Sequence, residues 1–248
     1  MCGLTGILLG VSERTKCDID GIAQLFSRLL ILSEHRGPYA TGAAFVTSVG
    51  DLHVEKAPLP AHKFVTTTGY HRLRKQLNAE TKVLMGHTRW PTQGSHYDNN
   101  NNQPLVDASV ALTHNGHIPD VSSIFRHFKL KREWTVDSEI ILRLASRHYK
   151  NSQTPVSSLL HDLSCCPGNL AAVLLNTTNS DEVIFIRRDR PLYTAFHPDR
   201  QILLYASEIA IIWQAIEVAS EWNIRTLPSN SAWVFSCNCL GSPVAISL

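Results

Sequence analysis

The first residues of the chain offer a nucleophile. Cys2 follows the initiator methionine, and cysteine is small enough to permit removal of Met1. Removal would leave Cys2 with a free α-amino group, whose ordinary pKa of about 7.7–8.0 suits proton transfer near neutral pH. Because the thiolate is the reactive form of cysteine, a base is needed beside it, and the amine of the same residue can serve. Taken alone, Cys2 is better explained as a small apolar residue that begins a buried strand.

A second motif, His35-Arg36-Gly37-Pro38, lies where the first long helix should end. Gly37 can cap that helix and Pro38 prevents its continuation, so a simple helix stop explains the motif. A functional interpretation holds Arg36 near the start of the chain. A cation there would favour the Cys2 thiolate and lower the pKa of the amine.

Polar residues also follow two buried strands further along. After the first, Arg89 offers a guanidinium that matches a carboxylate, with Trp90 as an apolar wall and Thr92 as a hydroxyl donor. After the second, Asn115 offers a side-chain N–H. The backbone of Gly116 permits close approach, so the pair can form an oxyanion hole. A surface arginine beside a packed tryptophan, and an Asn-Gly turn, are the plainer alternatives.

An acidic segment begins the helix predicted from about Asp137. Helix capping and the helix dipole account for acidic residues at such a position. In a functional interpretation, Asp137 pairs with the α-ammonium of a bound amino acid while Arg89 pairs with its carboxylate. Cys2 would then attack a side-chain amide, so the motifs together predict a site for a free amino acid.

Hydrophobic periodicity predicts the elements that position these residues. Strands are expected at 4–9, 42–48, 52–56, 82–87, 110–113, 169–176, 182–187, 192–196, 201–206, 223–227 and 232–236. Helices are expected over 19–30 with Asp18 as a possible cap, and at 70–79, 121–128, from 137 onward, 156–164 and 209–216. The four asparagines at 99–102 predict a surface loop. Consecutive hairpins with helices between them predict one α+β domain over 1–248, with mainly antiparallel sheets.

The composition narrows the class of protein. The chain has 248 residues, of which 44% are hydrophobic and 18% charged, and its net charge is +2. So small a net charge does not indicate a basic surface that would bind nucleic acid or a membrane. The sequence has no bilayer-length apolar run and no basic region typical of a signal peptide, so we expect a cytoplasmic protein. No Cys-x-x-Cys pair occurs, and we expect neither a metal nor a cofactor.

The motifs appear in an order and with gaps that are typical of one known family: Cys2-Gly3, His35-Arg36-Gly37, His87-Thr88-Arg89-Trp90, His114-Asn115-Gly116 and Asp137-Ser138-Glu139. Over nearly its whole length the chain resembles the class II glutamine amidotransferases, which are N-terminal-nucleophile hydrolases. It is most similar to the glutaminase domain of glucosamine-6-phosphate synthase. Residues 37–38 and 102–105 resemble asparagine synthetase instead.

The resemblance implies a four-layer αββα sandwich in which helices flank two antiparallel sheets. It also implies a γ-glutamyl thioester on Cys2, release of ammonia, and hydrolysis to glutamate. By the same analogy Trp90 and Thr92 line the pocket and Arg36 lies near the amine. Four positions depart from the family pattern: Tyr39, Gln93, Gln103 and Asp120.

Three functions are compatible with these observations. The first is a glutaminase that supplies ammonia to a separate synthetase or transferase, because the sequence has no sugar-isomerase domain and no Gly-rich ATP loop. The second is a catalytically weak or inactive binding module of the same fold. The third is an amidase for a different amide, which Arg89 and Asp137 disfavour because a blocked amine would leave Asp137 unpaired.

Overall fold

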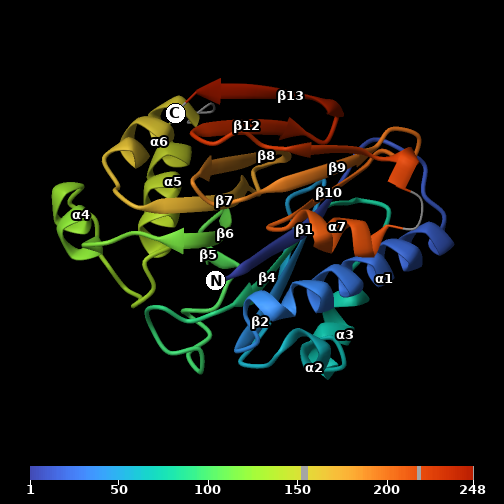
Figure 1. The fold of residues 1–248 in the computed structure, drawn as a ribbon, viewed down its shortest axis with the longest axis horizontal. Coiled ribbons are helices and arrows are strands. Elements are labelled where there is room, and N and C mark those ends of the chain that lie inside the picture. Colours follow the sequence, from blue (N-terminus) through green and yellow to red (C-terminus); the bar gives the residue numbers. More distant parts are fainter. Residues whose placement is uncertain (152–155, 217–218, 248) are drawn as a thin grey trace.

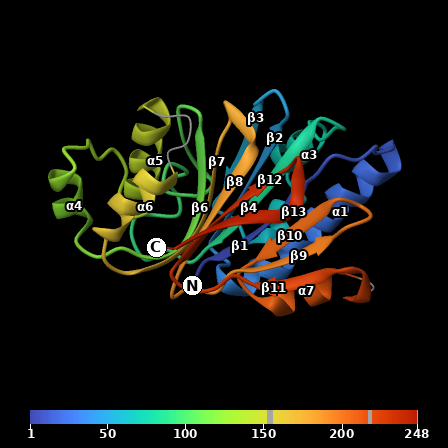
Figure 2. The ribbon, with the colours of Figure 1, turned by 90° about the horizontal axis from the view of Figure 1, so that it is seen from above.

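The computed structural model describes residues 1–151, 156–216 and 219–247. Two β-sheets lie face to face, and helices cover the outer face of each (Figures 1 and 2). All paired strands within these sheets run antiparallel. The predicted α+β class and αββα sandwich are therefore confirmed.

Among the described residues, the first sheet has seven strands in the order β11-β9-β10-β1-β4-β2-β3. In chain order these are β1 (Gly3–Leu9), β2 (Ala40–Thr47), β3 (Leu52–Ala57), β4 (Thr81–Arg89), β9 (Tyr193–His197), β10 (Ile202–Ala206) and β11 (Asn223–Thr226). Strand β1 is buried on both faces. Leu4 and Leu8 face the second sheet, whereas Ile7 and Leu9 face the helices, which explains why Thr5 is the one polar residue in its sequence.

The second sheet has the strand order β13-β12-β8-β7-β6-β5 over the described residues. Its strands are β5 (Leu105–Asp107), β6 (Val110–His117), β7 (Asn169–Asn176), β8 (Asn179–Arg188), β12 (Ser231–Ser236) and β13 (Cys239–Ser247). Aromatic side chains join the two sheets. The ring of Phe185 on β8 packs edge-on against Tyr205 of β10 with centroids 5.0 Å apart, a pair that contributes about 0.5–1.5 kcal/mol beyond its buried area.

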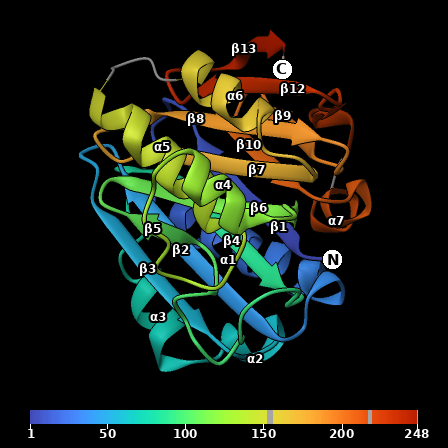
Figure 3. The ribbon, with the colours of Figure 1, turned by 90° about the vertical axis from the view of Figure 1, so that its left-hand side faces the viewer.

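The helices form the two outer layers, which Figure 2 shows on opposite sides of the sheets. The first sheet is covered by α1 (Lys16–Ser33), the 3₁₀ helix η1 (Glu34–Arg36), α2 (Ala61–Phe64), α3 (Thr68–Arg74) and α7 (Ile209–Ala215). The second is covered by α4 (Val121–His127), α5 (Glu139–Asn151) and α6 (Val156–Ser164), which cross in front of it in Figure 3. A short 3₁₀ helix, η2 (Ala219–Glu221), precedes β11. No helix within the described ranges is long and apolar enough to cross a membrane.

Most predicted elements are present, and the differences have local causes. The first helix is capped by Thr15, and Asp18 instead completes a reciprocal capping box by accepting the Thr15 backbone N–H at 2.8 Å. The helix predicted over 70–79 ends at Arg74. Strand β6 extends to residue 117 because it pairs with β7 over its whole length, so residues 114–116 lie within a strand. Strands β5 and β13 and helix α2 were not predicted.

The prediction of a surface loop at 99–102 is wrong for its second half. Asn99 and Asn100 are exposed, whereas Asn101 and Asn102 are buried. The Asn102 amide donates to the His96 carbonyl at 2.7 Å and to the Asn99 side-chain oxygen at 2.8 Å. The side-chain oxygens accept from outside the loop, that of Asn101 from Thr135 and that of Asn102 from Arg89. Because the buried amides are hydrogen-bonded on both sides, their burial costs little free energy.

Candidate active site

The predicted site residues come from strands of both sheets that end at the same edge of the sandwich. In the first sheet, Gly3 at the start of β1 is paired with Thr88 near the end of β4. The end of β4 also faces the second sheet, because His87 Nε2 lies 3.2 Å from the His114 carbonyl oxygen on β6. Cys2, which immediately precedes β1, therefore lies close to the polar end of β6. The chain start is marked N in Figure 1.

The Cys2 thiol lies against the backbone at the end of β4. Its Sγ is 3.4 Å from the Trp90 backbone nitrogen and 3.5 Å from the Trp90 carbonyl oxygen. Burial raises the pKa of the Cys2 thiol, although the Trp90 backbone hydrogen bond, the N-terminal ammonium and Arg89 each lower it. At neutral pH the thiol is therefore protonated, and its activation requires a base.

Arg36 holds the first residues of the chain from the side of η1. Its Nε donates to the Cys2 carbonyl oxygen at 2.9 Å, and its Nη1 forms an ion pair with Glu208 at the start of α7. Glu208 also accepts from His35 Nε2 at 2.9 Å. Glu208 was not predicted from the sequence as a site residue. It is 172 residues from Arg36, and its only local signal was an acidic residue beside a helix start.

A second arginine that the sequence analysis missed also lies beside the chain start. Arg190, between β8 and β9, has its Nη1 2.9 Å from the Met1 sulfur and its Nε 2.8 Å from the Asn169 side-chain oxygen. Burial lowers the pKa of the Met1 ammonium. The cations Arg36 and Arg190 lower it further, and Cys2 opposes them. The N-terminal amine at this edge therefore deprotonates at a lower pH than an exposed one.

Gly37 is a C-cap as predicted, although of η1, and its backbone N–H donates to the Glu34 carbonyl at 2.8 Å. It ends η1 with φ −168°, which is extended backbone, so left-handed capping does not explain it. A Cβ at this position would lie 2.3 Å from the Arg89 carbonyl carbon and 2.6 Å from the Trp90 nitrogen. Glycine is therefore required because η1 packs directly against the backbone between Arg89 and Trp90.

The buried Arg89 guanidinium is surrounded by oxygen atoms of the loop that follows it. Its Nη1 donates to the Asn102 side-chain oxygen at 2.8 Å and to the Ser95 carbonyl at 3.2 Å. Its Nη2 donates to the carbonyls of Gln93 and Gly94, the latter at 2.9 Å. Both terminal nitrogens thus donate twice. The assignment of Arg89 to a substrate carboxylate stays a prediction, and it requires exchange of some of these bonds.

The other residues predicted on this loop lie toward solvent. Trp90 is half-exposed, and its ring packs edge-on against Tyr39 with centroids 5.2 Å apart. Tyr39 also contacts His96, so the Tyr39 departure from the family pattern builds an aromatic cluster next to the Cys2 site. Thr92 is exposed, and its role in the pocket stays a prediction.

The predicted oxyanion donors lie on β6. Asn115 is only 2% exposed, and its Nδ2 has no hydrogen-bond partner among the described residues. A buried amide without a partner is uncommon, and it leaves a donor for an external oxygen. A Cβ on Gly116 would lie 2.1 Å from the Asn169 carbonyl oxygen, so glycine allows the close approach of β7.

Asp137 is 3% exposed and lies two residues before the start of α5. Its Oδ2 accepts the Ile118 backbone N–H at 2.9 Å and lies 3.7 Å from His117 Nδ1. Burial raises the pKa of Cys2 and lowers the pKa of Arg89, and the Asp137 charge adds to the first shift and opposes the second. The Cys2 thiol, the Arg89 guanidinium and the Asp137 carboxylate are thus close enough to influence one another electrostatically.

A buried polar network supports the site between β4 and β6. Gln103, which departs from the family pattern, accepts the His114 backbone N–H and donates to Ser138 Oγ at 3.1 Å. His114 Nδ1 lies 2.8 Å from the same hydroxyl. Burial, and then Arg89, lower the pKa of His87 to about 3, so this histidine is neutral at physiological pH.

Sequence comparison finds relatives over most of the chain, although no family model matches it. Glutamine–fructose-6-phosphate aminotransferase (isomerizing) of Chlamydia trachomatis serovar D is 26% identical over 205 residues, which are 80% of this chain and 31% of the relative. The Chlamydia pneumoniae enzyme of the same name is 29% identical over 204 residues, and the match covers 77% of this chain and 30% of the relative. The chain thus spans about three tenths of the length of these curated relatives.

Comparison with solved structures also finds glutamine amidotransferases. Glutamine phosphoribosylpyrophosphate amidotransferase from B. subtilis superimposes with a TM-score of 0.74 over 99% of this chain and 49% of that chain, at 19% identity. A glutamine aminotransferase class-II domain protein from Silicibacter pomeroyi superimposes with a TM-score of 0.57 over 100% of this chain and 98% of that chain, at 10% identity. This chain is a relative of the class II glutamine amidotransferases. The resemblance that its motifs indicate is confirmed, and these amidotransferase relatives are enzymes.

The fourth departure from the amidotransferase pattern has a conformational explanation. Asp120 follows β6 and adopts a left-handed backbone conformation, with φ 48° and ψ 40°, before α4. Asparagine and aspartate tolerate this region better than other non-glycine residues, because their short polar side chains hydrogen-bond locally. Aspartate can therefore replace the usual asparagine without changing the backbone.

Proposed function

We propose that this chain hydrolyses the side-chain amide of glutamine to glutamate and ammonia, with Cys2 as the nucleophile once Met1 has been removed. The observation that carries the proposal is the placement of four groups on adjoining segments, two of them beside the Trp90 backbone and two beside the end of β6. These are the Cys2 thiol, the Arg89 guanidinium, the unpartnered amide of Asn115 and the buried carboxylate of Asp137. A nucleophile, an oxyanion donor and opposite charges for a zwitterion are what this reaction needs.

In the first step the Cys2 α-amine accepts the thiol proton, and Sγ forms a bond to the amide carbon of glutamine. The amide oxygen becomes negatively charged and accepts hydrogen bonds from the Asn115 side chain and the Gly116 backbone N–H. The carbon–nitrogen bond then breaks, and the leaving nitrogen takes a proton from the Cys2 ammonium. Ammonia leaves, and a γ-glutamyl thioester stays on Cys2.

The second half regenerates the enzyme. A water molecule gives a proton to the Cys2 amine and attacks the thioester carbon, and the oxyanion forms again at Asn115 and Gly116. The carbon–sulfur bond breaks, glutamate is released, and Sγ recovers its proton. The raised pKa of Cys2 is compatible with this cycle, because the amine removes the proton only as the bond to carbon forms.

We further propose that the ammonia is used by an acceptor site outside residues 1–248, on a synthetase or transferase. This is supported by the names of the relatives, each of which pairs glutamine with a second substrate, and by the fraction of their length that the chain spans. Activity of the chain together with such a protein, compared with the chain alone, tests this part separately.

The decisive experiment measures glutamate release from glutamine by purified protein whose intact mass proves removal of Met1. Cys2→Ala should abolish release. Cys17→Ala should retain it, because Cys17 is exposed at the far end of α1. A processed wild-type protein that releases no glutamate would refute the proposal. Retention of Met1 would instead favour a binding module of the same fold.

A further inference from the structure

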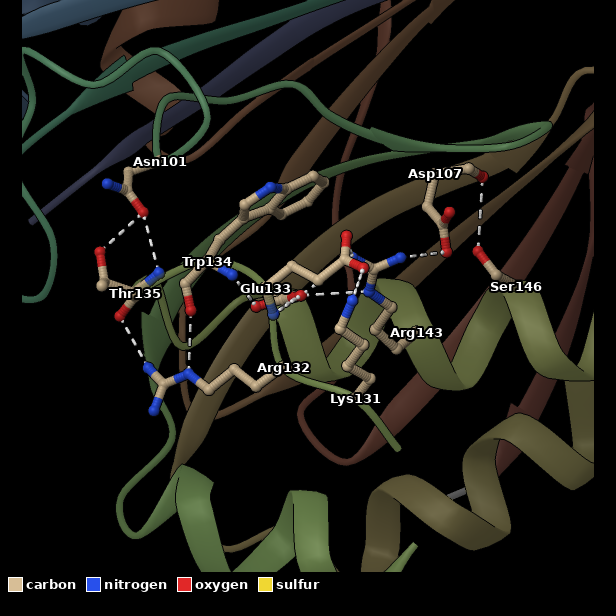
Figure 4. A network of polar contacts seen from close by, with 10 residues as sticks. Asn101, Asp107, Lys131, Arg132, Glu133, Trp134, Thr135, Arg143 and Ser146 are labelled. Atoms are coloured by element: carbon tan, nitrogen blue, oxygen red, sulfur yellow. Dashed lines mark hydrogen bonds and ion pairs between the residues drawn. The ribbon is translucent and has the colours of Figure 1, made fainter. Parts of the chain in front are cut away.

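A polar network joins two segments of the proposed glutamine pocket, and Figure 4 shows Asn101 at one end of it, bonded to Thr135. Asn101 is only 2% exposed. Its Oδ1 accepts from the Thr135 backbone nitrogen at 3.1 Å and from the Thr135 hydroxyl at 2.9 Å. Its Nδ2 donates to Asp98 at 3.2 Å and to the Ser95 carbonyl at 3.4 Å. One amide therefore connects the loop after β4 to the segment before α5.

At each end of this connection, the residue that contacts Asn101 lies next to a proposed substrate-binding group. The Ser95 carbonyl that Asn101 contacts also accepts from Arg89 Nη1. Thr135 lies two residues before Asp137. Gly94 brings the two segments together, because at its φ of +73° a Cβ would lie only 2.5 Å from the Thr135 hydroxyl. The proposed carboxylate and ammonium subsites are thus linked through Asn101.

The Thr135 end of the network is itself anchored. Glu139, in the first turn of α5, is fully buried and accepts the backbone N–H groups of Glu133 at 2.8 Å and Trp134 at 2.7 Å. Its charge is paired with Arg143 at 3.0 Å, and the Arg143 guanidinium lies 5.0 Å from the centre of the Trp134 ring. Asn101 therefore ties the loop to a rigid segment.

We infer that Asn101 is a positioning residue that fixes the loop around Arg89 to the segment carrying Asp137. The two ends of the pocket are thereby held at a set separation before glutamine binds. This inference rests on the proposed function. Without Asn101, glutamine binding must also order the loop, so affinity for glutamine falls while the chemistry at Cys2 is unchanged.

The test compares Asn101→Ala with Asn100→Ala in Met1-processed protein. Asn100 belongs to the same run, is exposed, and its side chain makes no hydrogen bond within the described part of the chain. Asn101→Ala should raise KM for glutamine about tenfold and leave kcat within about threefold, whereas Asn100→Ala should match wild type. Thr135→Val loses the hydroxyl but keeps the backbone N–H bond to Asn101, so it should raise KM in the same direction as Asn101→Ala but by less, and Thr135→Ser should match wild type.

Labelling of Cys2 separates pocket order from the nucleophile. A glutamine-like diazo-ketone should label Asn101→Ala about ten times more slowly than wild type, while iodoacetamide should react at the same rate with both. Values of KM for Asn101→Ala and Thr135→Val within twofold of Asn100→Ala, with active wild type, would overturn the positioning role alone. If wild type shows neither turnover nor diazo-ketone labelling, it is the proposed function that fails.

Discussion

Replacement of Asp137 by asparagine would isolate the negative charge proposed to bind the substrate ammonium. In the structure Asp137 accepts the Ile118 backbone N–H at 2.9 Å, and an asparagine side-chain oxygen can accept the same bond. The substitution therefore retains the shape and the local hydrogen bond while it removes the charge. We expect a folded protein whose affinity for glutamine is reduced.

The size of the effect follows from the burial of the carboxylate. Asp137 is 3% exposed, so its charge is poorly screened by solvent. A hydrogen bond to a charged group stabilises by about 1.5–3 kcal/mol, and its loss should lower kcat/KM for glutamine by about 10- to 150-fold. The Cys2 pKa is raised mainly by burial, and the substitution removes the smaller contribution of Asp137, so part of any rate change arises at the nucleophile.

A second substrate separates these two contributions. Glutaramate has the same side-chain amide and carboxylate as glutamine but lacks the α-amino group. The ratio of kcat/KM for glutamine to that for glutaramate should be high in wild type and fall toward one in Asp137→Asn, because effects on Cys2 cancel in the ratio. If the substitution lowers both values equally, Asp137 does not pair with the substrate ammonium.

Three further results are expected. Asn115→Ala should lower kcat about 10²- to 10³-fold with little change in KM, since one of two oxyanion donors is lost; steady-state kinetics with an unchanged kcat would contradict this. His87 has its pKa lowered from 6.5 to about 3 by burial, so its contribution to stability is complete above pH 6.5 and falls as the pH drops toward 3, by up to about 5 kcal/mol. Urea unfolding at pH 7 and pH 4 should therefore show a smaller acid loss in His87→Gln than in wild type, and an equal loss would argue against the burial effect. Finally, because a protonated Cys2 amine cannot accept the thiol proton, kcat/KM should decline on the acid side as that amine becomes protonated, and a profile that stays flat to pH 5 would exclude the amine as base.

The sandwich was predictable because its strands carry a two-sided apolar pattern. In β1, Leu4 and Leu8 alternate with Ile7 and Leu9, and each set fills a different layer of the core. The same logic identified most strands of both sheets and helix α6 with its observed bounds. It missed β13 because Gly241 and Pro243 interrupt a strand at the edge of the sheet, where a missing donor and a missing side chain are tolerated.

The candidate site was only partly predictable, because its motifs show which groups are present but not what each one contacts. Glu208 and Arg190 lie in no motif, and only the fold brings them to the first two residues of the chain. Asn101 was expected at the surface because its polarity is visible in the sequence, whereas the partner that allows its burial, Thr135, is 34 residues away. Long-range hydrogen bonds of this kind leave no periodic signal.

The contacts of Arg89 set a condition on how an amino acid can enter. Its terminal N–H groups already donate to loop oxygens. A substrate carboxylate must therefore displace some of these oxygens as acceptors. The exchange replaces bonds from the guanidinium to neutral oxygens by bonds to an anionic carboxylate, which favours the substrate. It also releases carbonyls of residues 93–95, which must then turn toward solvent. We therefore expect glutamine binding and movement of this short segment to be a single event, limited on one side by Asn101 and on the other by the packing of Gly37 against the Arg89 backbone.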